Sequence, residues 1–116
     1  MKKHSGGCHC KAVRYEVETD LEKVIECNCS HCAIKGLLLT FVPATQFTLL
    51  QGEDNLTEYR FNTHKIQHLF CKTCGVESFG RGTNKEGAAT IAINARCLDD
   101  IDLASLTRTP VDGKSY

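Results

Sequence analysis

The sequence lacks any long apolar segment. No run approaches the ~20 apolar residues that a membrane-spanning helix needs, although 41% of the 116 residues are hydrophobic. Residues Met1–Gly7 carry positive charge with no apolar stretch behind them, so they do not predict a secretory signal. We therefore expect no membrane partner and a cytoplasmic location, in which cysteines stay reduced and available to metal.

Net charge and basic clusters are missing as well. Fourteen Lys and Arg residues balance fourteen Asp and Glu residues, and no segment gathers the basic residues together. The electrostatic footprint of a nucleic-acid-binding protein is therefore absent. No segment has two cysteines followed by two histidines on a helix, as a zinc finger does, so we expect no nucleic-acid partner. The length is typical of one domain, which we expect to span residues 1–116.

Cysteine, in contrast, is abundant. Seven of the eight cysteines fall into three clusters, namely Cys8 and Cys10, then Cys27, Cys29 and Cys32, then Cys71 and Cys74. Cysteines one or two residues apart are poorly placed to form a disulfide with each other, and the spacing favours metal. Structural zinc normally has four protein ligands, whereas catalytic zinc has three and an open position. Seven thiolates divide as four plus three, which predicts two zinc ions per chain.

The first and third clusters suit a closed site. In Cys71-x-x-Cys74 the two-residue spacer lets both sulfurs reach one ion at about 2.3 Å. Gly75 follows and can adopt φ > 0, so that backbone amides turn toward the thiolates. Cys8 and Cys10 offer two more thiolates from a tight turn. Pairing the two clusters would pin the first strand to a late one.

The cluster at residues 27–32 is too compact to recruit a fourth cysteine from its own segment. Its missing ligand would be water, a substrate, His31 or Cys97. His31 is either a ligand or proton donor, or a solvent-facing residue between two cysteines. We favour Cys97 as a small buried hydrophobic residue; as a ligand it would instead close the site and make it structural.

A period of two in the hydrophobic pattern predicts β-strands along most of the chain. Apolar and polar residues alternate over Val13–Val17, Thr57–Phe61 and Ile66–Phe70, the last with its even-numbered residues on the inward face. Leu37–Val42 is a short apolar run, which predicts a core strand, and Ile91–Ile93 marks another.

Turns and one short helical segment complete the predicted fold. Turn-rich stretches lie at residues 51–55, 62–65, 80–87 and 110–113. The segment before Leu37 leaves no room for a useful helix, and the only helical candidate is a turn or two at Asp102–Leu106, capped by Asp102. We therefore predict an all-β fold of short antiparallel strands, stapled by zinc that contributes to the folding energy.

Five segments resemble a known family. They are Gly7–Cys10, Cys27–Cys32, Tyr59–Thr63, Phe70–Val76 and Asn94–Asp99. In this order they resemble the glutathione-dependent formaldehyde-activating enzyme (GFA) family, which includes centromere protein V. The resemblance implies an Mss4-like β-tent, with a structural zinc ion on Cys8, Cys10, Cys71 and Cys74 and a catalytic one on Cys27, Cys29 and Cys32. It also implies a carbon-sulfur lyase that joins glutathione and formaldehyde into S-(hydroxymethyl)glutathione.

An open three-thiolate site is chemically suited to such a reaction. An incoming thiol, glutathione or a similar small molecule, would replace water and lose its proton because the cation lowers its pKa. It would then lie beside an aldehyde carbonyl, oriented for carbon-sulfur bond formation. Two alternatives stay open, a non-enzymatic zinc scaffold and a redox-sensitive module that ejects zinc on oxidation. The protein would be a monomer or a homodimer.

Several other polar residues are weaker candidates. Glu77 and Arg81 follow the third cluster and could line the site, with Arg81 or Arg96 receiving a substrate carboxylate; solvated surface charges are an equal expectation. His64 and His68 lie on a strand or turn, about 13 Å apart along the chain. We do not expect them to share a metal ion.

Overall fold

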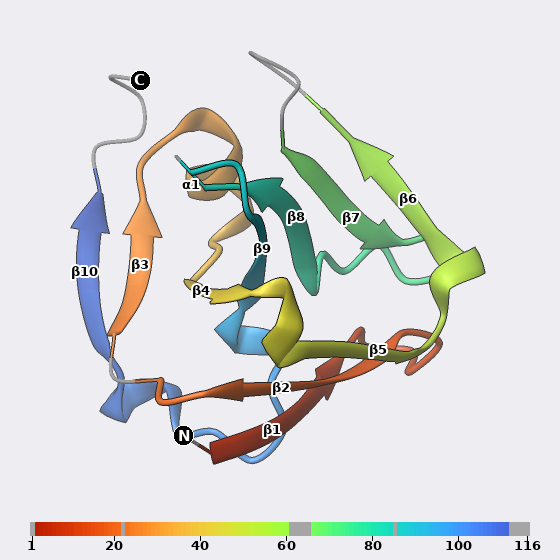
Figure 1. The fold of residues 1–116 in the computed structure, drawn as a ribbon, viewed down its shortest axis with the longest axis horizontal. Coiled ribbons are helices and arrows are strands. Elements are labelled where there is room, and N and C mark those ends of the chain that lie inside the picture. The colour runs from red at the N-terminus through yellow and green to blue at the C-terminus, as the bar shows by residue number, and fades with distance from the viewer. Residues whose placement is uncertain (1, 22, 61–65, 85, 112–116) are drawn as a thin grey trace.

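The structure, a computed structural model, describes residues 2–21, 23–60, 66–84 and 86–111 (Figure 1). Within these residues, strands alternate with short helical turns. In chain order the elements are β1 (Lys2–Gly7), β2 (Arg14–Thr19), β3 (Lys23–Cys27), α1 (Ser30–Lys35), β4 (Leu39–Pro43), η1 (Ala44–Gln46), β5 (Phe47–Gln51), η2 (Glu53–Asn55), β6 (Leu56–Tyr59), β7 (Gln67–Cys71), β8 (Phe79–Thr83), β9 (Ala89–Asn94), η3 (Ala95–Cys97), η4 (Leu103–Ser105) and β10 (Thr107–Val111). The all-β fold predicted from the sequence is confirmed.

The strands form two sheets. The smaller has the order β1-β2-β5 and the larger the order β10-β3-β4-β9-β8-β7-β6. In Figure 1 the smaller sheet lies across one end of the larger, with β10 and β6 at the two outer edges. The described strand pairs are antiparallel, as predicted, apart from β10 and β3, which run parallel.

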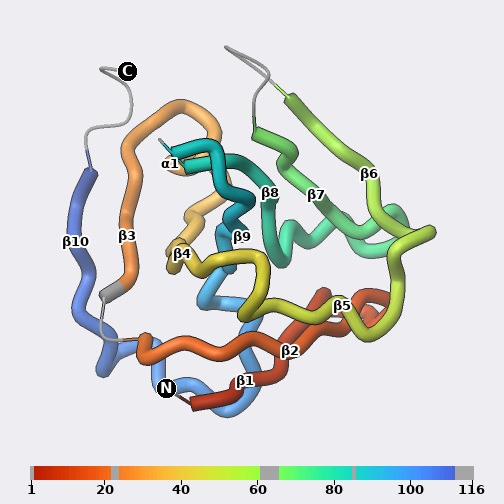
Figure 2. Tube along the Cα trace, in the orientation of Figure 1, coloured from red at the N-terminus to blue at the C-terminus, as the bar shows by residue number. Residues whose placement is uncertain are grey.

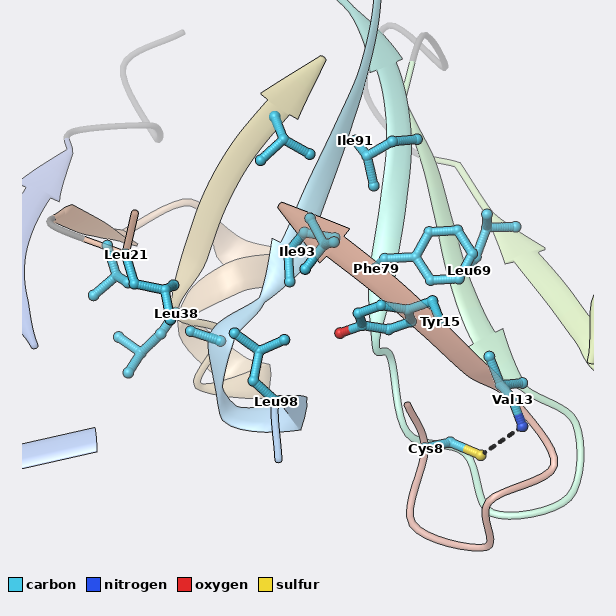
Figure 3. Close-up of a cluster of buried hydrophobic side chains, with 14 of the residues drawn as sticks. Cys8, Val13, Tyr15, Leu21, Leu38, Leu69, Phe79, Ile91, Ile93 and Leu98 are labelled. Atoms are coloured by element: carbon cyan, nitrogen blue, oxygen red, sulfur yellow. Dashed lines mark hydrogen bonds between the residues drawn. The ribbon is translucent and has the colours of Figure 1, made fainter. Parts of the chain in front are cut away.

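The core lies between the two sheets, and its centre is aromatic. Tyr15 on β2 is fully buried, and its ring centroid lies 5.2 Å from that of Phe47 and 5.8 Å from that of Phe79. Its hydroxyl donates to the carbonyl of Ser78 over 3.3 Å. Figure 3 shows Tyr15 and Phe79 facing each other across the core. The predicted strand at Val13–Val17 is confirmed, because its alternate residues supply this core and join the smaller sheet to the larger.

Helix α1 corrects the expectation that no helix fits before Leu37. Cys29 has an extended backbone, and its sulfur accepts the N–H of Cys32 over 3.4 Å, so that it caps the first turn. Gly36 ends the helix with φ of +68°, a left-handed conformation that glycine adopts without strain. With both ends capped, this six-residue helix forms the connection from β3 to β4, which can be followed in Figure 2.

Two stretches predicted as turns begin within strands, whereas the later part of the first does turn, with the N–H of Gly87 donating to the carbonyl of Asn84. Residues 80–83 belong to β8, where a Cβ added to Gly80 would lie 3.0 Å from the carbonyl oxygen of Gln67. Gly80 therefore serves a close approach of backbones rather than a turn. Pro110 lies in β10, an edge strand, where the missing N–H of proline is tolerated.

Strand β7 is present, but the face that it buries is the opposite of the one predicted. Leu69 and Cys71 are buried, whereas Ile66, predicted to face inward, is half exposed. The predicted cap at Asp102 is confirmed, since its carboxylate accepts the N–H of Ala104 over 3.2 Å at the start of η4. The predicted turn at residues 62–65, with His64, lies outside the described residues, as do Phe61 and positions 112 and 113.

Candidate metal centre

Four cysteine sulfurs meet where the smaller sheet touches the larger. The Sγ atoms of Cys8, Cys10, Cys71 and Cys74 all lie within 4.8 Å of one another. The Sγ of Cys10 is 3.6 Å from that of Cys8 and 3.6 Å from that of Cys71. Sulfurs bound at about 2.3 Å to one tetrahedral zinc ion are roughly 3.8 Å apart. The cluster therefore offers four sulfur donors close enough to bind one metal ion, and none of these cysteines forms a disulfide.

Two turns and several amide groups position these sulfurs. Cys8 follows β1, and its sulfur accepts the N–H of Val13 over 3.3 Å (Figure 3). Cys71 ends β7 and accepts from the N–H of Thr73 over 3.4 Å and from the side-chain amide of Asn55 over 3.2 Å. Burial alone would raise the pKa of the Cys71 thiol, but nearby backbone N–H groups lower it to about 6. The hydrogen bond from Asn55 was not predicted from the sequence, because Asn55 is 16 residues from Cys71 and no local pattern links the two.

The other three clustered cysteines form a second group around the start of α1. The Sγ atoms of Cys27, Cys29 and Cys32 lie within 4.8 Å of one another. Cys27 ends β3, Cys29 caps the helix and Cys32 lies in its first turn. Burial opposes ionisation of Cys29, but hydrogen bonds from Cys32 outweigh it and lower the pKa of the Cys29 thiol. Burial raises the pKa of the Cys32 thiol.

A hollow opens beside this second group. It has a volume of about 270 Å³, and Cys27 and Cys32 lie in its wall together with Asn28, Gly36 and Arg96. Arg96 is exposed, and its Nε donates to the carbonyl of Gly36 over 2.9 Å. A small molecule in this hollow can therefore reach two of the sulfurs and one guanidinium group.

Arg81, the other arginine predicted to receive a carboxylate, lies elsewhere. Its guanidinium carbon is 5.5 Å from the centroid of the Phe79 ring, and it lines a different hollow together with Phe47. Arg96 is therefore the arginine that the fold brings to the three-cysteine group.

Neither Cys97 nor His31 joins the three sulfurs. Cys97 belongs to neither sulfur group; it is half buried, with its sulfur 3.8 Å from the carbonyl oxygen of Glu77. Burial raises the pKa of the Cys97 thiol to about 12. The ring of His31 is buried beside His68 and Glu77. His31 is thus not the solvent-facing residue that one interpretation allowed.

Glu77 is buried, which corrects the expectation of a solvated charge. Its Oε1 accepts from Nζ of Lys35 over 2.8 Å and lies 3.4 Å from Nε2 of His31, while its Oε2 lies 3.5 Å from Nδ1 of His68. Burial opposes ionisation, but the interactions with His68 and Lys35 outweigh it and lower the pKa of Glu77. Burial lowers the pKa of His31. No local sequence signal links Glu77 to its partners, because His31 and Lys35 come from α1 and His68 from β7.

An all-β fold with two groups of cysteine sulfurs defines a cysteine-rich protein with the donor atoms to bind metal. A family model described as "Glutathione-dependent formaldehyde-activating enzyme" matches residues 3–110, and the chain belongs to this family. A crystal structure of a Rhodobacter sphaeroides protein from a structural genomics programme is similar, with a TM-score of 0.78 and 27% sequence identity over 90% of this chain and 99% of that chain. The resemblance and the fold class predicted from the sequence are confirmed.

Within the described parts of the chain, no helix combines the length and apolar character that crossing a membrane requires.

Proposed function

We propose that residues 1–116 form one zinc domain that adds a small thiol, such as glutathione, to formaldehyde or another aldehyde at the Cys27, Cys29 and Cys32 group. Family membership supports a function of the glutathione-dependent formaldehyde-activating type. The observation that carries the proposal is the hollow, because two of the three grouped cysteines, Cys27 and Cys32, lie in its wall within reach of a small molecule.

The two sulfur groups fit zinc in different ways. Four sulfurs within 4.8 Å of one another, with that of Cys10 3.6 Å from those of Cys8 and Cys71, can fill a tetrahedral site and leave no position for substrate. Three sulfurs beside an opening leave one position free, which is typical of catalytic zinc. We therefore propose one structural zinc ion on Cys8, Cys10, Cys71 and Cys74 and one catalytic ion on Cys27, Cys29 and Cys32.

Zinc bound to three thiolates would lower the pKa of an incoming thiol and hold it as the thiolate nucleophile. The chain itself supplies the ligands and their orientation. Cys29 is fixed by its capping bond from the N–H of Cys32, and its lowered thiol pKa favours the charged form that metal requires.

Arg96 would orient the thiol substrate. Its side chain lines the same hollow as Cys27 and Cys32, and a guanidinium group binds carboxylates through paired hydrogen bonds. Glutathione carries two carboxylates, so one of them can be received by Arg96 while its sulfur reaches the three-cysteine group. This positioning would leave the aldehyde to approach from the open side of the hollow.

Substitution of Cys29 tests the proposed function. The purified chain is mixed with glutathione and formaldehyde, and S-(hydroxymethyl)glutathione formation is followed by exchange NMR, with the uncatalysed rate subtracted. Cys29→Ser should abolish the catalysed rate, remove one zinc ion per chain and leave the circular dichroism spectrum unchanged. Cys97→Ser is the matched control and should keep both rate and zinc. Unchanged turnover in Cys29→Ser would refute the proposal, and a wild-type chain that binds zinc without accelerating the reaction would support a scaffold.

A further inference from the structure

A third set of ligand-type side chains lies apart from the cysteine sulfurs. His31 comes from α1, His68 from β7, and Glu77 from the segment before β8, and their ligand atoms lie within 4.8 Å of one another. We propose that these three residues form an additional binding site for a divalent transition-metal ion. The proposal depends on the geometry of this set and is independent of the proposed enzymatic reaction.

The distances within the set suit a shared ion. Nε2 of His31 is 3.4 Å from Oε1 of Glu77, and Nδ1 of His68 is 3.5 Å from Oε2. Nitrogen and oxygen ligands bound at about 2.1 Å to one tetrahedral ion lie roughly 3.4 Å apart. Each nitrogen lies near a different oxygen of the same carboxylate, so one ion held by both oxygens would meet both imidazoles.

The burial and negative charge of Glu77 also favour a bound cation. The side chains of His31 and Glu77 are only 7% and 5% exposed, and a carboxylate at this depth needs a cation beside it. Lys35 supplies one, with its Nζ 2.8 Å from Glu77, but the Lys35 side chain is 33% exposed and can turn toward solvent. Two imidazoles and a carboxylate suit Zn²⁺, Co²⁺ or Fe²⁺.

An ion at this site would steady the three-cysteine group. His31 lies on the six-residue helix α1, between Cys29, which caps it, and Cys32. So short a helix has little stability of its own. Bonds from one ion to His31, His68 and Glu77 would fix α1 to β7 and to the segment before β8, and would thereby fix the positions of the sulfurs.

Cobalt binding tests the site on the zinc-containing chain as purified. The chain is equilibrated with excess Co²⁺ and desalted, and total zinc plus cobalt per chain is measured by elemental analysis. We expect His68→Gln to hold about one ion fewer than the wild type. His4→Gln, which changes a histidine on β1, should bind as the wild type does. The sulfur-to-cobalt charge-transfer absorption, which reports cysteine ligation, should be the same in all three chains.

A second variant keeps all three ligands. Lys35→Met removes the competing ammonium group, so it should retain the additional ion against a chelator about 10-fold better than the wild type. Residues beside a metal ligand change metal affinity on this scale, about 10-fold or more. A metal content that His68→Gln does not lower would overturn the inference. If His68→Gln does not fold, the test is Lys35→Met. Retention of the additional ion by Lys35→Met no better than that of the wild type would then overturn the inference. Failure of the proposed function appears separately, as unchanged turnover in Cys29→Ser.

Discussion

The two cysteine groups should contribute unequally to stability, because they join different lengths of chain. Cys10 and Cys71 are 61 residues apart and meet at one site, whereas the other group lies entirely within residues 27–32. If a metal cross-link acts on the unfolded chain as a covalent one does, closing the long loop stabilises the fold by about 4 kcal/mol, against about 2 kcal/mol for the short loop. Loss of the closed site should therefore cost about 2 kcal/mol more.

Two double variants measure this difference. Cys10→Ser with Cys74→Ser removes half of the closed site, and Cys27→Ser with Cys29→Ser removes most of the open group. The pairs are matched, because none of the four side chains is fully buried. Urea unfolding at a fixed concentration of free zinc should place their midpoints roughly 1 M apart, with the closed-site variant lower.

Chelation provides the control for this experiment. With zinc removed, the wild type and both variants lack the cross-links, so the difference between the two variants should disappear. A difference that persists in chelator would mean that packing or hydrogen bonding of the thiols, not metal, accounts for it. Equal midpoints in the presence of zinc would refute the loop argument itself.

Two further substitutions test the core and the surface. Phe79→Ala should lower the free energy of unfolding by about 4 kcal/mol, because Phe79 is buried between the two sheets; Phe41→Ala, which changes a half-exposed residue, should cost about 1 kcal/mol or less. Equal losses in urea unfolding would contradict the assigned core. The Arg14 guanidinium beside Asp99 lowers the pKa of that carboxyl. The pair therefore stabilises the fold fully at pH values above the normal aspartate pKa. This stabilisation is lost as the pH falls through the lowered pKa of Asp99. Because Asp99 is nearly half exposed, Asp99→Asn should cost only about 0.5 kcal/mol at neutral pH. This difference should shrink in acid, and a difference that is constant with pH would exclude the pair as its source.

The sequence was most informative where spacing limits geometry. Cysteines two or three residues apart can share one ion, so the pattern predicted the groups that the fold brings together. Strands such as Val13–Val17 were predictable because a two-residue period admits few alternatives. Helix α1 was missed because cysteine is not among the preferred capping residues, although Gly36 marked the end of the helix.

Contacts between separate elements could not be read from local patterns. Gly80 was assigned to a turn because nothing nearby in the sequence shows that the backbone of Gln67 approaches it. His68 was considered only with its sequence neighbour His64, whereas in the fold it meets His31 from α1 and Glu77 from the segment before β8. Residues brought together by strand pairing and helix docking become visible only when the topology is known.

The two sulfur groups lie in different parts of the fold, so that one can stabilise the fold while the other carries the proposed reaction. The closed group joins the turn after β1 to the end of β7, which belong to different sheets. The open group is carried by α1 and the end of β3, beside a hollow. Because its sulfurs bridge no distant segments, loss of the ion proposed there would leave the closed group still joining the two sheets. Substitutions at Cys29 should therefore report on chemistry with little interference from unfolding.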